Sequence, residues 1–221
     1  MTKQKKRLFD VITIFPDMID SYAKESILGR AQTNKLIEIK AHNLRDYTSD
    51  KHSKVDDTPY GGGPGMLMKV EPFYKAVRKI KKKLKKTRVI MTAASGKLFT
   101  QEDANRLSKY DQVIFLCGRY EGIDHRVQEK IADESLSIGN YVLTGGELPA
   151  LAMIDSISRM VPGVLGSKES LDNESHTQEG VLEHPQYTKP EVFNKWPVPK
   201  VLLSGHHKDI ETWRRKHEHN K

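Results

Sequence analysis

Short apolar runs rich in β-branched residues alternate along the chain with stretches whose apolar positions recur at helical spacing. The runs typical of strands are "RLFDVITIF", "KLIEIKAHN", "RVIMTA", "QVIFLC" and "SLSIG". The stretches that predict helices lie at about 20–34, 100–109, 124–132 and 147–161. Strands that alternate with helices at these lengths predict a parallel sheet covered by helices.

A strongly basic segment, "RKIKKKLKKTR" at 78–88, carries eight basic residues and no acidic one, against a formal net charge of +8 for the whole chain. Phe73, Val77, Ile80 and Leu84 recur at helical spacing, which predicts an amphipathic helix with its lysines facing outward. Such a helix is either a solvated surface or a patch that contacts phosphates, and the sequence leaves both interpretations open.

The chain divides by composition into three parts. We expect an α/β domain at 1–162, a mobile polar linker at 163–182, and a short C-terminal part at 183–221 with a basic helix around 207–219. The single cysteine, Cys117, lies in an apolar run and is typical of a buried small side chain. No disulfide framework, leader peptide or membrane-spanning run is predicted, so a cytoplasmic protein is expected.

Three glycine-bearing segments follow predicted strands, at 92–97, 117–122 and 138–147. Ligands of open parallel sheets bind where strands end at their carboxyl edge, and glycine lets the main chain approach a ligand closely. Three such junctions predict one shared pocket. The dinucleotide fingerprint, the phosphate-binding loop with its Lys-Ser/Thr pair and zinc-ligand spacing are all absent from the sequence, and no metal site is predicted.

Five segments carry a resemblance to a known family: "VDDTPYGGGPGM", "LCGRYEGID", "SIGNYVLTGGELPA", "ISRMVPGVLG" and "PQYTKPEV". In this order they resemble the signature blocks of the bacterial tRNA (guanine-N1)-methyltransferases, members of the SPOUT class, and the match runs from about Arg7 to Arg215. The resemblance implies an α/β fold whose parallel sheet contains a deep trefoil knot, a rare exception to the rule against threaded loops. It also implies a small, apparently shortened C-terminal helical part, because family members usually continue with further helices that grip the anticodon stem.

The resemblance further implies methyl transfer from S-adenosylmethionine to N1 of the guanosine just 3′ of the anticodon in tRNA, by a homodimer whose active site is shared between subunits. The cofactor-binding residues it implies are Ala93, Ala94, Gly96, Gly118, Tyr120, Glu121, Gly122, Ile138, Gly139, Tyr141, Leu143, Gly145 and Gly146. The residues it implies near the target base are His52, Asp56, Asp57, Tyr60, Gly61, Gly62 and Gly63. The family often has a proline where Ala94 stands.

Methylation of guanine N1 requires a base for the N1 proton and a cation for the charge that builds on O6. By resemblance Arg159 supplies the cation, and the linker acid is Glu174 where the family usually has an aspartate; Asp172 is the rival candidate. Glu121 and Asp155 either orient the base or cofactor or are structural. The alternatives are a sister SPOUT enzyme that acts on another RNA position or on a ribose, and a non-catalytic RNA-binding protein of the same fold.

Overall fold

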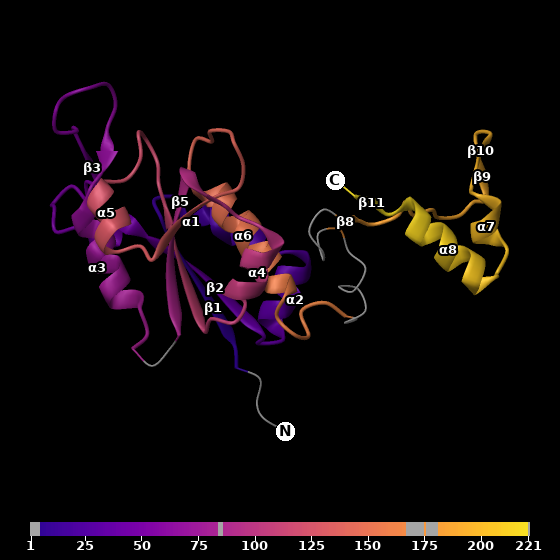
Figure 1. Cartoon of the computed structure of the whole chain (residues 1–221). Helices are drawn as coiled ribbons and strands as arrows, with labels where there is room; N and C mark the ends of the chain where they lie inside the picture. The colour runs from indigo at the N-terminus through magenta and orange to yellow at the C-terminus, as the bar shows by residue number, and fades with distance from the viewer. Residues whose placement is uncertain (1–4, 84–85, 167–174, 176–180, 221) are drawn as a thin grey trace. The chain divides into compact units, whose positions relative to one another are not determined.

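A computed structural model describes residues 5–83, 86–166, 175 and 181–220 of the chain. The chain divides after Leu165 into two compact units, which are considered separately below. The larger unit contains a five-stranded sheet with helices on both faces (Figure 1). The α/β class and the parallel sheet predicted from the alternating pattern are therefore confirmed.

The five strands of the sheet run parallel in the order β2-β1-β6-β5-β7. Their bounds are Arg7–Thr13 for β1, Ile37–Asn43 for β2, Thr87–Leu98 for β5, Gln112–Cys117 for β6 and Glu134–Ser137 for β7. All residues of the central strand β6 are buried, as expected for a strand covered on both faces. Two further short strands, β3 (Asp56–Asp57) and β4 (Leu67–Met68), form an antiparallel pair.

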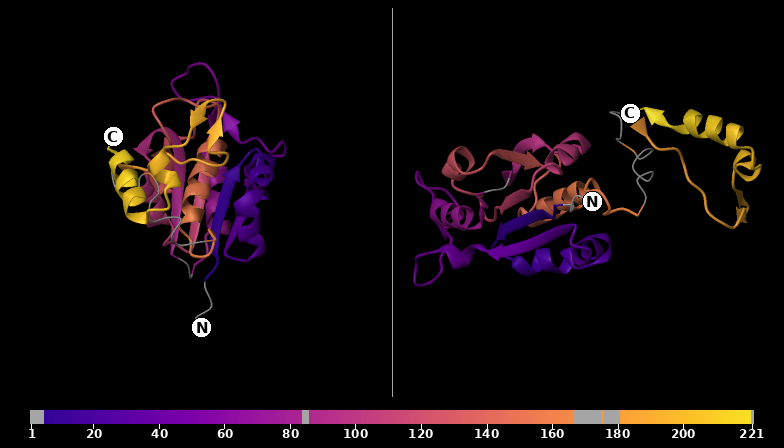
Figure 2. Two further views of the ribbon diagram at one scale, coloured as in Figure 1. Left: turned by 90° about the vertical axis from the view of Figure 1, so that its right-hand side faces the viewer. Right: turned by 90° about the horizontal axis from the view of Figure 1, so that it is seen from below.

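Helices cover both faces of the sheet, as the two views of Figure 2 show. The first face carries α1 (Pro16–Ala23), α2 (Ser26–Thr33), α4 (Gln101–Leu107) and α6 (Glu147–Arg159). The second carries the 3-10 helix η1 (Leu44–Tyr47), α3 (Val70–Ile80) and α5 (His125–Lys130). Each face has its own apolar core, so the sheet is buried between two layers.

The helical stretch predicted at about 20–34 is confirmed as helical, but it forms two helices, α1 and α2, and α1 begins earlier, at Pro16. Ser26, the first residue of α2, has a φ of 49°, a left-handed conformation that interrupts the helical path. Gly29 then lies so close to Lys24 that a Cβ would come within 2.8 Å of the Lys24 carbonyl carbon. Glycine at position 29 therefore permits the close approach of α2 to the end of α1.

The predicted lysine-rich helix is wrong in extent, because α3 ends at Ile80 and most of the basic run follows it. The buried side chain of Gln112 accounts for this end. Its amide nitrogen donates to the Ile80 carbonyl at 3.1 Å, and its amide oxygen accepts from the Lys82 main-chain N–H at 3.0 Å. Phe73, Val77 and Ile80 face the core as predicted, whereas Leu84 lies outside the described residues.

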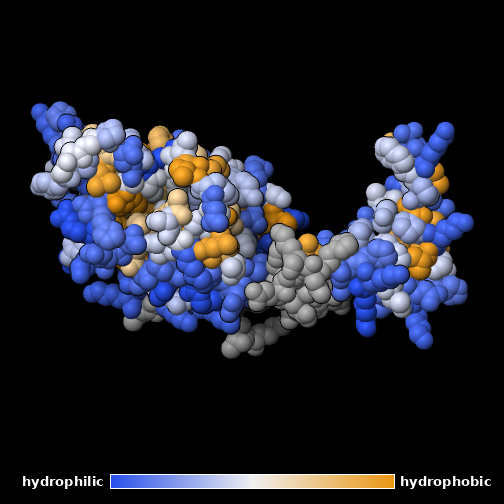
Figure 3. All heavy atoms as spheres, turned by 45° about the horizontal axis from the view of Figure 1, so that its top comes forward, coloured by the Kyte–Doolittle hydropathy of each residue, from blue (hydrophilic) through white to orange (hydrophobic). Residues whose placement is uncertain are grey.

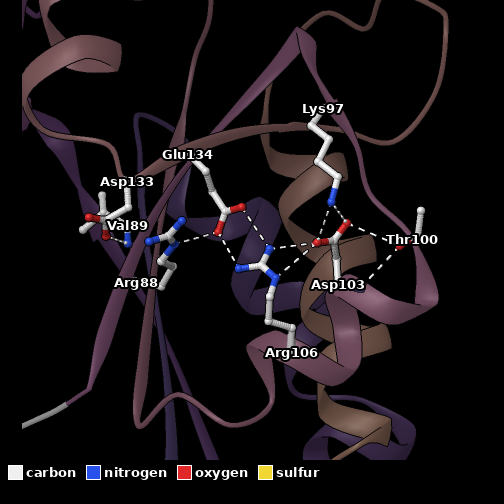
Figure 4. A network of polar contacts seen from close by, with 8 residues as sticks. All are labelled: Arg88, Val89, Lys97, Thr100, Asp103, Arg106, Asp133 and Glu134. Carbon is white, nitrogen blue, oxygen red and sulfur yellow. Dashed lines mark hydrogen bonds and ion pairs between the residues drawn. The ribbon is translucent and has the colours of Figure 1, made fainter.

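An ion-pair network joins α4 to strands β5 and β7 (Figure 4). Arg106 donates to Asp103 at 2.8 Å and to Glu134 at 2.9 Å, while Lys97 and Arg88 reach the same two carboxylates. Burial alone would raise the pKa of both carboxyl groups. The hydrogen bonds and charges of the three cations outweigh this effect, so the pKa of Asp103 and that of Glu134 lie below their usual values.

The described residues of the smaller unit form two two-stranded ribbons and two helices. Its elements are β8 (Val181–Leu182), β9 (Val192–Phe193), β10 (Trp196–Pro197), α7 (Lys200–Leu203), α8 (His207–His217) and β11 (His219–Asn220). β8 pairs with β11 and β9 with β10, while the Trp213 ring stacks on His217 at 4.1 Å. The basic helix expected around 207–219 is confirmed as α8, ending at His217.

Candidate functional site

The three glycine-bearing segments meet at the carboxyl ends of β6, β5 and β7, which are neighbours in the sheet. The first segment lies inside β5, where the pairing with β7 shifts register between Thr92 and Lys97, so that the intervening residues bulge out. The second follows β6 and the third follows β7. The prediction that all three share one pocket is confirmed, because residues of each line the same cavity.

This cavity has a volume of ≈ 400 Å³, within the range of small-molecule sites. Its lining includes these predicted cofactor residues: Ala93, Ala94, Gly118, Tyr120, Glu121, Gly122, Ile138, Gly139, Tyr141, Leu143, Gly145 and Gly146. Gly96 is the exception. It packs against β7, where a Cβ would lie 2.7 Å from main-chain atoms of Leu136, so Gly96 permits the bulge and does not line the cavity.

The sequence did not predict a polar cluster of Arg119, Glu147 and Thr13, which links two of the segments that line the cavity. Glu147 is fully buried at the start of α6, where its carboxylate accepts from the Thr13 hydroxyl at 2.6 Å and from Arg119 Nε at 2.9 Å. Arg119 also donates to the Thr144 carbonyl at 3.3 Å, and its guanidinium lies over the Phe15 ring. Arg119 thus connects the segment after β6 to the segment after β7. The only signal in the sequence was a charged residue between two glycines.

The main chain is also packed tightly at Gly146. Its N–H donates to the Gly118 carbonyl at 2.9 Å, and a Cβ would lie 2.9 Å from main-chain atoms of both Cys117 and Gly118. Glycine is therefore required here by the close approach of the start of α6 to the end of β6. Cys117 is buried directly behind this contact. Burial and the nearby Glu147 charge raise the pKa of its thiol well above the usual value, so Cys117 is a neutral core side chain, as predicted.

The loop that precedes β4 is fastened to the rim of the cavity. Met68 N–H donates to the Gly122 carbonyl at 3.0 Å, Glu121 N–H donates to the Met66 carbonyl at 3.1 Å, and Gly65 lies against the Glu121 side chain. None of the residues predicted near the target base lines the cavity itself: His52, Asp56, Asp57, Tyr60, Gly61, Gly62 and Gly63. Asp56 and Asp57 form β3, His52 lies in the turn before it, and the other four lie on this adjoining loop, with the Tyr60 side chain fully exposed.

The predicted catalytic residues do not lie at the cavity within the described part of the chain. Arg159 is the last residue of α6, whose first residue, Glu147, lies behind the cavity wall. The twelve residue-to-residue steps of this 13-residue helix, at about 1.5 Å each, separate the two by about 18 Å. Asp155 accepts from the Tyr22 hydroxyl at 2.8 Å, and this hydrogen bond raises the Tyr22 pKa. Glu174 and Asp172 lie outside the described residues.

Among the described residues, no group of three or more His, Cys, Asp or Glu side chains could hold a metal ion. No helix in the same part of the chain has the length and apolar character needed to cross a membrane.

Comparison with known proteins gives a consistent result. Residues 7–221 match the family model described as tRNA (Guanine-1)-methyltransferase TrmD. A protein of Ruminiclostridium cellulolyticum is 54% identical over 207 residues, which cover 93% of this chain and 88% of the relative. Proteins of Dictyoglomus turgidum (54% identical; 94% and 83% covered) and Geotalea uraniireducens (50% identical; 94% and 84% covered) are similar in the same way. All three relatives are named tRNA (guanine-N(1)-)-methyltransferase.

Proposed function

The chain belongs to the tRNA (guanine-1)-methyltransferase family, and from this premise we propose that its three-segment cavity holds S-adenosylmethionine for methylation of tRNA. The chain is an S-adenosylmethionine-dependent tRNA (guanine-N1)-methyltransferase that acts on N1 of the guanosine just 3′ of the anticodon. The observation that carries the placement is the convergence of three glycine-bearing segments around one cavity of ≈ 400 Å³ at the carboxyl ends of neighbouring strands.

The cavity fits the cofactor in size and in chemistry. Tyr141, Leu143 and Ile138 offer apolar walls for an adenine ring, while the glycines expose main-chain N–H and C=O groups that can bind its polar edge. Gly146 and Gly118 keep the start of α6 and the end of β6 close enough for this main-chain surface to form. When bound, S-adenosylmethionine supplies an electrophilic methyl group.

The chain's own residues supply the remaining chemistry. Glu174 takes the N1 proton, with Asp172 as the alternative, and the guanidinium of Arg159 stabilises the negative charge that develops on O6. A planar guanidinium suits this role because it can donate two parallel hydrogen bonds to a developing oxyanion and its neighbour. Glu121 lies at the rim of the cavity, beside the loop that carries Asp56, Asp57 and Tyr60, where the target base would enter.

The active enzyme is a homodimer in which each subunit contributes to its partner's site. The separation of about 18 Å between Arg159 and the start of α6 supports this, because one rigid helix cannot bring both ends to a single cavity. The apolar side chains exposed on and beside α1 and at the start of α6 support it too: Phe15, Met18, Tyr22 and Leu148. Figure 3 shows exposed hydrophobic patches on this unit among polar surroundings.

The sheet is knotted at the cofactor site. Support comes from the path of residues 138–146, which leave the edge strand β7, cross the end of β5 and return to β6, where Gly146 bonds to Gly118. The smaller unit, with basic residues in the last turn of α8, contributes to tRNA binding through the part at 183–221. The enzyme works in the cytoplasm, where its tRNA substrate is found.

Methyl mapping on defined RNA tests this function. The protein is incubated with labelled S-adenosylmethionine and an unmodified tRNA transcript that has guanosine just 3′ of the anticodon, and the label is located after nuclease digestion. We expect 1-methylguanosine at that position and no label in a matched transcript with adenosine there. Label on a ribose or at another position would indicate a sister enzyme of the same class, and cofactor binding without transfer would indicate a binding protein.

A further inference from the structure

A second cavity, of ≈ 450 Å³, lies at the opposite edge of the sheet from the cofactor cavity. Glu38, Lys40 and His42 alternate along the edge strand β2, so their side chains share one face of the sheet and form its floor. The other face of β2 is apolar and packs into the core beside α1 and α2. The polar face of β2 is therefore open, and we call the cavity above it the lysine groove.

The carboxylates of the lysine groove are already engaged. Asp10 accepts from His42 Nε2 and from Gln112 Nε2, each at 2.7 Å, and Glu38 pairs with Lys6 at 2.7 Å. Tyr47 contacts the other ring nitrogen of His42 at 3.3 Å. Burial, followed by the nearby carboxylates, raises the pKa of the Tyr47 phenol and keeps it neutral. Both carboxylates that line the groove therefore already have partners, and neither is free to attract a further cation.

Four lysines line the groove from two directions: Lys40, Lys79, Lys81 and Lys82. Lys79 lies over the Tyr47 ring at 5.6 Å, and within the part of the chain that the structure describes Lys40, Lys81 and Lys82 form no ion pair. Gln112 ends α3 at Ile80 and so turns the lysines after it toward the groove. The groove therefore carries excess positive charge on both of its sides.

We propose that the lysine groove binds the phosphodiester backbone of RNA, as an anion-binding site separate from the cofactor cavity. The identification of that RNA as the tRNA substrate rests on the proposed function. Each ammonium group can neutralise one phosphate without reading a base, so the groove adds affinity and no sequence preference. Ammonium groups on both sides of an open groove suit a chain of phosphates better than one small anion.

The test replaces Lys40 and Lys82 with glutamine in the full chain, and tRNA binding is measured by fluorescence anisotropy over a range of salt concentrations. We expect weaker binding and a log–log salt slope smaller by about two units, one for each lost phosphate contact. Lys109→Gln/Lys130→Gln is the matched control, because it removes two exposed lysines outside the groove. Its slope should stay within one unit of the parent's.

Two further arms separate this inference from the proposed function. Binding to an unmodified transcript needs no methyl transfer, so the groove is tested even if the protein methylates nothing. Cofactor affinity, measured by calorimetry, should be the same in the groove variant and the parent. An unaltered salt slope in the groove variant would overturn the proposal, and so would saturable binding of inorganic phosphate that the variant loses while it keeps full tRNA affinity.

Discussion

Replacing Arg119 with methionine should destabilise the larger unit strongly, because Glu147 would keep a fully buried carboxylate without its cation. Arg119 Nε lies 2.9 Å from Glu147 Oε2, and the Arg119 side chain is itself only 16% exposed. Removal of one partner from such a buried pair typically costs about 3–5 kcal/mol, and only the Thr13 hydroxyl would remain on the carboxylate. We therefore expect Arg119→Met to lower the free energy of unfolding by about 3–5 kcal/mol.

The matched variant removes both charges at once. Arg119→Met/Glu147→Gln leaves a neutral amide that still accepts from Thr13, so we expect it to recover more than half of the lost stability. Because Arg119 also holds the Thr144 carbonyl, both variants should bind S-adenosylmethionine about tenfold or more weakly, which corresponds to about 1.4 kcal/mol. A double variant that gains nothing over Arg119→Met would show that the charge of Glu147 is not the cause.

Urea unfolding provides the assay, with far-ultraviolet circular dichroism as the probe of the larger unit. Both tryptophans of the chain, Trp196 and Trp213, lie in the smaller unit, so their fluorescence provides an internal control. The circular-dichroism transition should move to lower urea in the variant while the fluorescence transition stays in place. A loss of less than about 1 kcal/mol in Arg119→Met would refute the reasoning, because it would mean that the pair is not effectively buried.

Three other predictions follow from the site and the fold. Gly146→Ala should abolish cofactor binding in calorimetry, because a Cβ would lie 2.9 Å from two main-chain atoms; unchanged affinity in a folded variant would contradict the placement. Glu174→Gln should slow single-turnover methyl transfer by ~10²–10⁴-fold with cofactor affinity kept, and Asp172→Asn should matter little; the reverse result would assign the base to Asp172. The pKa values of Asp103 and Glu134 are lower in the folded state than in the unfolded state, where they lie near about 4. The two carboxylates therefore stabilise the fold fully above about pH 4, and this contribution is lost as the pH falls through their folded-state pKa values. Unfolding free energies measured between pH 6 and pH 3 should therefore drop more in the parent than in Arg106→Gln, and parallel curves would refute this.

The sequence predicted what periodicity and glycine placement encode. The parallel sheet followed from alternating strands and helices, and the shared cavity followed from three glycine-bearing segments at strand ends. It did not predict features made by residues far apart in the chain. Gln112 ends α3 from 32 positions away, and Thr13 meets Glu147 across 134 positions. A single sequence without spatial information carries no signal for such pairs.

In the candidate site, too, local pattern predicted some features, while others depend on contacts between distant residues. Gly96 shares the composition of its loop, yet only the register shift in β5 reveals that it packs against β7 instead of lining the cavity. The pattern of the lysine run predicts one amphipathic helix, because Leu84 continues the apolar spacing. No neighbouring residue in the run indicates that the helix ends at Ile80. The assignment of Arg159 and Glu174 rests on resemblance, and stays a prediction for both residues.

The most direct test of the account is amide hydrogen exchange with and without S-adenosylmethionine, because the proposed site binds its ligand largely through the main chain. We expect the cofactor to slow exchange in peptides covering 92–97, 117–122 and 138–146, and to leave exchange in the lysine groove at 38–42 and 79–82 unchanged. Saturating cofactor that protects none of the three segments, or that protects a different surface, would contradict the central claim that this cavity is the methyl-donor site.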